Sequence, residues 1–119
     1  MNRRECERAV RRGAKLLDKY FNGTDWAKKI NRASLDVASI GSCTLVQLFG
    51  GYCEGVGTLN LRVDNAIKYG FESTVVMKGE RATAMRAVEE YNYLTKCWKE
   101  EIASRLIKNG NLEAFKMFV

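Results

Sequence analysis

The last third of the sequence places the strongest constraint on the fold, because apolar residues recur every three or four positions over residues 80–108. That spacing is typical of one face of an α-helix and not of a β-strand. The residues that keep it are Met85, Val88, Tyr91, Thr95, Trp98, Ile102 and Leu106. The sequence contains no proline, and Asn109-Gly110 supplies a helix stop. We therefore expect one long C-terminal helix, about 40 Å in length.

The remaining apolar patterns predict shorter helices. An amphipathic helix over residues 3–21 has an apolar stripe made of Cys6, Ala9, Val10, Ala14, Leu17, Tyr20 and Phe21. Asn22-Gly23 ends it in a left-handed turn. Further helical segments are predicted at residues 26–30, at residues 43–49 with Ser42 as the cap, and at residues 59–69 with Gly70 as the stop.

Two segments are not predicted to be helical. Residues 50–57 include four glycines and are expected to form a bend, and they lack the Lys-Ser/Thr ending of a phosphate-binding loop. Residues 74–77 are expected to form a loop or a short edge strand, and residues 112–118 offer one more amphipathic turn. The predicted fold is all-α, a single helical domain over residues 1–119 in which the long C-terminal helix packs on several short ones.

Charge is distributed unevenly along the chain. The sequence has 20 Lys and Arg, 14 Asp and Glu, and a formal net charge of +6. Residues 1–32 carry ten cations and four carboxylates, whereas the remainder is neutral, so the whole excess lies in the first quarter. The cations that cluster on the outer side of the first predicted helix are Arg4, Arg8, Arg11, Arg12, Lys15 and Lys19. This face is either a contact for a phosphate backbone or an acidic protein surface, or a solvated face that maintains solubility.

The composition argues against an enzyme. The chain has no histidine, and so no imidazole general base, no Ser-His or Cys-His pair and no histidine metal ligand. Its adjacent carboxylates, Glu89-Glu90 and Glu100-Glu101, do not face one another on a helix and are expected to lie on the surface. No catalytic residues are therefore predicted.

The cysteines leave two alternatives open. They are Cys6, Cys43, Cys53 and Cys97, without a Cys-x-x-Cys pair. The first and last lie among apolar residues of predicted helices and are expected to pack as small hydrophobes. The middle two bracket a short helix and its glycines, so they either form a zinc site with a carboxylate such as Asp36 or Glu54, or remain two buried thiols. No other cofactor is expected.

Tyr93 is a candidate partner contact. It falls beside the apolar stripe of the long helix, between that stripe and the polar side. An exposed aromatic ring near cations is typical of a protein-binding hot spot.

A run in the middle of the chain adds a resemblance. Leu35-Asp36, followed by Cys43-Thr44-Leu45-Val46-Gln47-Leu48-Phe49-Gly50, resembles a motif of small uncharacterised proteins encoded by bacteriophages and bacterial prophages. The resemblance covers about residues 13–102 and includes Tyr52, Gly70-Phe71 and Trp98. Many of those proteins carry a cysteine where this chain has Ile40. The resemblance implies a mobile-element protein that acts in the bacterial cytoplasm, and it implies no reaction.

These observations together predict a non-enzymatic inhibitor. Through its basic helical face it would bind and block a bacterial nucleic-acid defence complex, as anti-CRISPR proteins do, and its partner would be an effector protein or nucleoprotein. The alternative is a nucleic-acid-binding or regulatory module of the phage itself. No apolar run approaches the length of about 18 residues that spans a bilayer, and no signal-peptide core is present, so a cytoplasmic location without membrane contact is expected.

Overall fold

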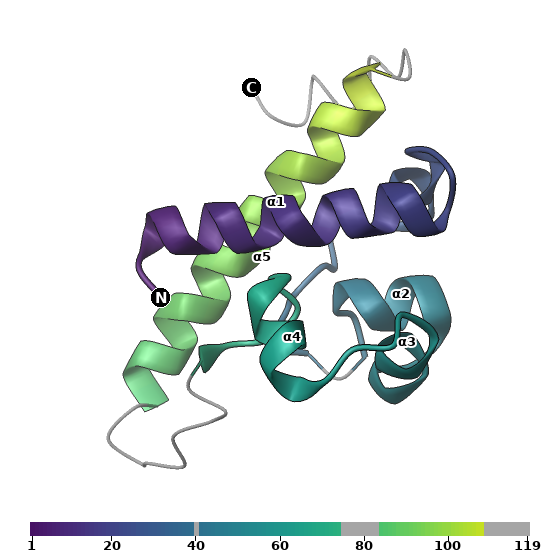
Figure 1. Cartoon of the computed structure of the whole chain (residues 1–119). Helices are drawn as coiled ribbons and strands as arrows, with labels where there is room; N and C mark the ends of the chain where they lie inside the picture. Colours follow the sequence, from purple (N-terminus) through teal and green to yellow (C-terminus); the bar gives the residue numbers. More distant parts are fainter. Residues whose placement is uncertain (40, 75–83, 109–119) are drawn as a thin grey trace.

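The computed structural model describes residues 1–39, 41–74 and 84–108 (Figure 1). Over these residues the chain forms helices and no strand, which confirms the predicted all-α class. The elements are α1 (Arg3–Tyr20), the 3-10 helix η1 (Asp25–Lys29), α2 (Thr44–Phe49), α3 (Tyr52–Thr58), α4 (Val63–Lys68) and α5 (Ala84–Lys108). The long C-terminal helix α5 packs on the shorter ones, as expected.

Helix α1 is defined by signals at both ends. The side chain of Asn2 accepts a hydrogen bond of 2.8 Å from the backbone amide of Glu5, whose carboxylate accepts one from the amide of Asn2. This capping box satisfies amides that a helix start leaves unpaired. At the other end Asn22 has a φ of 53° and Gly23 a φ of 149°, so the predicted left-handed stop is confirmed. The side that faces the core consists of Cys6, Ala9, Val10, Gly13, Ala14 and Leu17.

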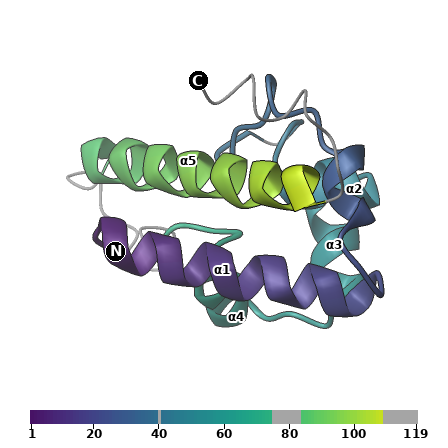
Figure 2. The same cartoon turned by 90° about the horizontal axis from the view of Figure 1, so that it is seen from above.

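Helices α1 and α5 pack on each other with their N-terminal ends toward the same side of the molecule (Figure 2), and α5 passes behind α1 at an oblique angle in the view of Figure 1. Met1 contacts Glu90 near the beginning of both helices, and Asp18 contacts Arg105 near their ends. Helix α4 lies against another side of α1. Helices α2 and α3 pack on each other and lie below the C-terminal half of α1 in the view of Figure 1. Helix α1 is therefore held from two sides.

The segment that follows α4 passes close to the backbone of α1. Gly70 has a φ of 76°, and a Cβ atom there would lie 2.8 Å from the Cα of Val10. Reciprocally, a Cβ atom on Gly13 would overlap the carbonyl oxygen of Tyr69 and lie 2.9 Å from the Trp98 ring. Two glycines thus let the backbones of α1 and of residues 69–70 touch, and the indole nitrogen of Trp98 donates a hydrogen bond of 2.7 Å to the Gly70 carbonyl.

The core is built around aromatic rings contributed by distant parts of the chain. Trp98 stacks on Phe71 with 5.2 Å between ring centroids and meets Trp26 edge-on at 6.2 Å. Burying rings of this size contributes about 2 to 3 kcal/mol each. The largest fully buried apolar side chains are Trp26, Trp98, Leu17, Leu45, Leu94, Ile102 and Val10.

The middle of the chain corrects several sequence-based expectations. Residues 50–57 are not merely a bend, because most of them belong to α3. A Cβ atom on Gly55 of that helix would lie 2.9 Å from the Cβ of Leu45, so the absence of a side chain at Gly55 lets α2 and α3 pack closely. The cap residue of α2 is Cys43 and not Ser42. Asn60, with a φ of 55°, follows the end of α3, so the helix expected at residues 59–69 begins only at α4.

Among the stripe residues of α5 whose burial the structure describes, Val88 differs from the prediction. Val88 is 61% exposed. Glu90 marks the side on which α5 meets the start of α1, and Val88 lies two residues earlier, about 200° around the helix from that side. Four predicted features lie wholly or partly outside the described residues. They are the start of the long helix at residues 80–83, its stop at Asn109-Gly110, residues 75–77 of the candidate strand, and the turn at residues 112–118.

Candidate interaction surface on helix α1

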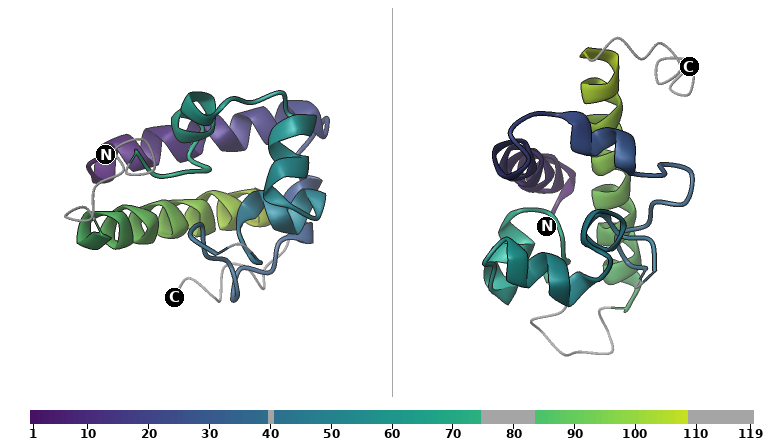
Figure 3. Two further views of the ribbon diagram at one scale, coloured as in Figure 1. Left: turned by 90° about the horizontal axis from the view of Figure 1, so that it is seen from below. Right: turned by 90° about the vertical axis from the view of Figure 1, so that its right-hand side faces the viewer.

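All six cations predicted for the first helix are exposed along one side of α1. With a turn of about 100° per residue, they fall within an arc of about 100° opposite the buried side. The distance along the axis from the first to the last is about 22 Å. These residues, here called the basic face, are Arg4, Arg8, Arg11, Arg12, Lys15 and Lys19. Helices α5 and α4 lie against different sides of α1 and leave this face open (Figure 3).

Two of the six side chains are engaged with the protein itself. The Nε of Arg11 lies 3.6 Å from a carboxylate oxygen of Glu101, and the Nε of Arg12 donates a hydrogen bond of 2.9 Å to the carbonyl of Lys68. The other four, Arg4, Arg8, Lys15 and Lys19, have no carboxylate within ion-pair distance among the described residues. The charge of the basic face is therefore largely uncompensated.

The C-terminal half of α1 is fixed by a charged network. Arg105 donates hydrogen bonds of 2.9 and 2.7 Å to the two carboxylate oxygens of Asp18, and its Nη1 donates one of 2.7 Å to Glu101. The indole nitrogen of Trp26 donates to Asp18 as well, at 2.8 Å. Hydrogen bonding to Asp18 raises the pKa of Arg105 above its ordinary value. The network joins α1, η1 and α5, so the basic face stands on a rigid support.

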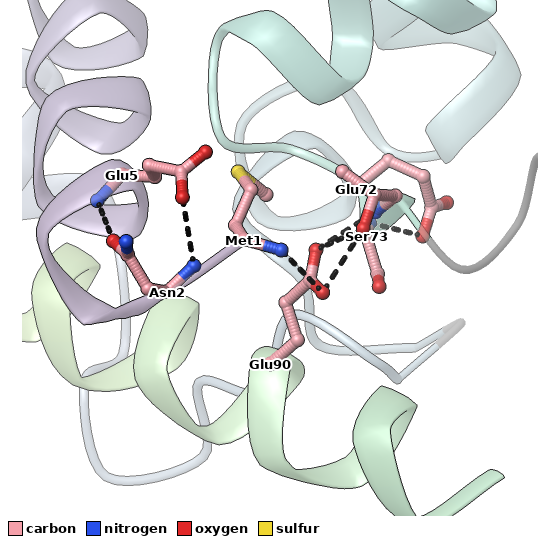
Figure 4. Close-up of polar contacts among 7 residues, drawn as sticks. Met1, Asn2, Glu5, Glu72, Ser73 and Glu90 are labelled. Carbon is pink, nitrogen blue, oxygen red and sulfur yellow. Dashed lines mark hydrogen bonds and ion pairs between the residues drawn. The ribbon is translucent and has the colours of Figure 1, made fainter. Parts of the chain in front are cut away.

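The N-terminal end of α1 is fixed by a buried carboxylate, that of Glu90 in α5 (Figure 4). The Met1 ammonium lies 3.0 Å from Glu90, and the Thr74 amide and hydroxyl donate to the same side chain at 2.8 and 2.9 Å. Glu90 is 5% exposed, so the expectation that it lies on the surface was wrong. Burial alone would raise the pKa of Glu90, but these hydrogen bonds outweigh burial and hold the pKa below its ordinary value of 4.5.

Tyr93 lies apart from the basic face. It is half-buried, and its hydroxyl donates a hydrogen bond of 3.1 Å to Glu89, which raises the pKa of Tyr93. The ring lines a surface pocket of about 390 Å³ together with Met1, Asn2, Arg3, Glu89 and Glu90. The structure therefore places Tyr93 beside the start of α1, next to Arg3 and not along the six cations.

The cysteines divide into three buried thiols and an exposed one. Cys6 and Cys97 are buried in α1 and α5, as predicted, and burial raises the pKa of each to about 11. Cys43 is buried at the start of α2, where burial raises its pKa. Cys53 is exposed in α3, so the alternative of two buried thiols at these positions was wrong for Cys53. The part of the chain that the structure describes contains no group of three or more Cys, Asp or Glu side chains able to hold a metal ion.

Two surface features were not predicted from the sequence. One is a groove of about 690 Å³ between residues 32–33 and α5, lined by Arg32, Ala33, Asn92, Thr95, Lys96, Lys99 and Glu100. The other is an aromatic cluster at the C-terminal end of α1, made of Tyr20, Phe21 and Phe49. The spacing of Asn92, Lys96 and Lys99 on one helix side was a usable signal for the groove, but the pairing of residues 20–21 with residue 49 depends on the tertiary fold.

None of the helices over the described residues is long and apolar enough to cross a membrane. No family model matches the chain, and neither a curated protein nor a solved structure is significantly similar to it.

Proposed function

We propose that this protein acts by binding and not by catalysis, as a phage-encoded inhibitor in the bacterial cytoplasm. Its basic face contacts the nucleic-acid component of a bacterial defence complex and so blocks that complex, in the manner of anti-CRISPR proteins. The observation that carries the proposal is the basic face itself: six exposed cations on one side of a rigid helix, four of them without a carboxylate partner among the described residues.

The chemistry of that face favours phosphates. Cations spread over about 22 Å of helix match a row of phosphates better than a single carboxylate. No Asn or Gln lies within α1, so the helix lacks the side chains that commonly read adenine. Contacts between its cations and phosphates carry no base information, and these contacts are expected to be independent of sequence. Binding of this kind supplies affinity and orientation, and it needs neither a cofactor nor zinc.

The test compares two variants that carry the same change in charge. Arg8→Glu with Lys15→Glu alters the basic face, and Lys28→Glu with Arg62→Glu alters exposed cations elsewhere. Fluorescence anisotropy measures binding of each to labelled RNA, to labelled DNA and to a guide-RNA-loaded defence nuclease, whose cleavage rate is recorded alongside. Thermal melting shows whether each variant folds.

The wild-type chain is expected to bind the loaded nuclease and to slow its cleavage. If four cations each displace a counterion, affinity should fall about 100-fold between about 50 and 200 mM salt. The basic-face variant should lose binding and inhibition, and the control variant should retain both. Equal behaviour of the two folded variants, or no binding at low salt, would overturn the proposal.

The alternative, a nucleic-acid-binding or regulatory module of the phage, makes a different prediction in the same experiment. It is favoured by the second set of cations in the groove beside α5, Arg32, Lys96 and Lys99, which offers a longer strand another contact. In that case the chain binds free RNA or DNA with the same salt dependence and leaves the rate of the nuclease unchanged.

A further inference from the structure

An aromatic cluster adjoins the last cation of the basic face. The ring of Tyr20 meets that of Phe21 edge-on with 4.9 Å between centroids, and meets that of Phe49 at 5.7 Å. Phe21 and Phe49 stack on each other at 5.7 Å. Tyr20 follows Lys19 in the sequence but lies about 100° from it around the helix, so the cluster adjoins the end of the basic face and extends away from it.

Tyr20 is the outermost member of the cluster. It is 47% exposed, whereas Phe21 and Phe49 are half-buried and support it from the protein side. Tyrosine often lies partly exposed in proteins, and exposure alone would mean little. Here the exposed ring is braced by two others, and a cation, Lys29, lies over one of them. Proteins that bind single strands combine aromatic rings and cations in this way.

The support of the cluster is rigid. Phe49 is the last residue of α2, and the side chain of Gln47 in that helix accepts a hydrogen bond of 2.6 Å from the amide of Asn31 and donates one of 2.9 Å to the carbonyl of Ser42. Tyr20 is the last residue of α1, which the network of Asp18 and Arg105 holds in place. The ring is therefore preorganised and loses little freedom when a base stacks on it.

A further cation lies at the same place. The Nζ of Lys29 lies 5.4 Å from the centroid of the Phe21 ring. Its ammonium puts positive charge against one of the two rings that brace Tyr20. This surface is complementary to a ligand that carries negative charge and has flat rings free to stack on a side chain. An unpaired nucleotide has both a negative phosphate and a free base.

We propose that the nucleic acid recognised by the basic face is single-stranded, and that one of its bases stacks on Tyr20 while its phosphates follow the cations of α1. This inference rests on the proposed function and narrows it from nucleic acid in general to an unpaired strand. A duplex keeps its bases inside the helix, so it would contact the cations but leave the ring of Tyr20 unused.

The test uses two substitutions of one residue. Tyr20→Leu keeps an apolar side chain over Phe21 and Phe49 but removes the aromatic face, and Tyr20→Phe keeps the face. Anisotropy measures binding of each full-length variant to a short single-stranded RNA, to a DNA of the same sequence, and to the corresponding duplex DNA. Tyr20→Leu should bind the single strands about 10-fold more weakly, in the range measured for loss of a stacked base. Tyr20→Phe should bind all three probes as the wild-type chain does.

Three results separate this inference from the proposed function. The salt dependence of Tyr20→Leu should equal that of the wild-type chain, because no phosphate contact is lost. Equal affinity of the wild-type chain for single strands and duplex, or an unchanged affinity of folded Tyr20→Leu for the single strands, would overturn the inference and leave the proposed function intact. Absence of binding to every nucleic acid and to the loaded nuclease would overturn both.

Discussion

Arg105 of α5 and Asp18 of α1 are 87 residues apart in the sequence and form an ion pair with two hydrogen bonds, 2.9 and 2.7 Å long. The guanidinium also lies 5.5 Å from the centroid of the Trp26 ring, so it contacts the core and the surface network together. Arg105 thereby fixes the C-terminal half of α1, which carries Lys15, Lys19 and the ring of Tyr20. Loss of these hydrogen bonds would therefore destabilise the fold and also displace the residues of α1 that form the candidate binding surface.

Replacement of Asp18 by asparagine should destabilise the fold by about 2 to 3 kcal/mol, because it removes the carboxylate that accepts two of the three hydrogen bonds from the largely buried guanidinium of Arg105 to carboxylates. Glu7→Gln is the matched control, since Glu7 pairs with Arg3 at 3.8 Å on the exposed side of α1. Loss of that pair should change stability by less than about 0.5 kcal/mol. Urea denaturation followed by circular dichroism measures both, and a cost that is equal in the two variants would contradict the structure.

Gly13→Ala should destabilise the fold by about 3 kcal/mol, because its methyl group would overlap the Tyr69 carbonyl and force α1 away from residues 69–70. Gly57→Ala is the matched comparison. A Cβ atom on Gly57, which lies in α3, would extend into open space, so alanine should stabilise that helix by about 0.5 kcal/mol. Thermal melting should move the two variants in opposite directions, and a neutral Gly13→Ala would contradict the close approach of the two backbones.

Stability should fall in acid partly because of Glu90. Its pKa in the folded chain is below the ordinary value of 4.5, so its contribution is present above that value and is lost as the pH falls through the folded pKa. Glu90→Gln should cost about 2 kcal/mol at neutral pH and should flatten the loss of stability between about pH 5 and pH 3. Glu89→Gln, an exposed neighbour, should keep the wild-type slope. Parallel pH profiles for the Glu90→Gln and wild-type chains would refute this assignment.

Thiol chemistry should distinguish Cys53 from the other cysteines. Cys53 is exposed, whereas Cys6, Cys43 and Cys97 are buried with raised pKa values. Because the thiolate is the reactive form, iodoacetamide at neutral pH should modify the native chain at Cys53 and the urea-unfolded chain at all four positions. Peptide mass spectrometry identifies the sites, and rapid native labelling of Cys43 would contradict its buried place at the start of α2.

The helices at the two ends of the chain could be predicted because their signals are local. The stop at Asn22 acts within a few residues of the end of α1, as Gly70 does after α4, and the apolar repeat of α5 is carried by its own residues. The basic face of α1 was predictable for the same reason, since a helical repeat determines which side chains share a side. Its exposure could also be inferred, because the opposite side is apolar.

The partners of two carboxylates, the buried Glu90 and the partly exposed Asp18, could not be predicted in this way. Glu90 and Asp18 sit beside apolar positions and look like ordinary surface residues of a helix until their partners, the Met1 ammonium and Arg105, are placed by the tertiary fold. Helix α3 was missed because glycine is a poor helix former, and the packing of Gly55 against Leu45 outweighs that preference. The joining of Tyr20 to Phe49 likewise depends on how α2 meets the end of α1.

The pair of tryptophans gives the chain an internal optical reporter. Trp26 is 1% exposed and Trp98 is fully buried, and each indole nitrogen is hydrogen-bonded inside the protein. Their emission should be blue-shifted in the native chain and should move to the red only when the core opens. A strand bound on the outer side of α1 touches neither ring, so an unchanged tryptophan spectrum during a titration would establish that a variant which fails to bind is still folded.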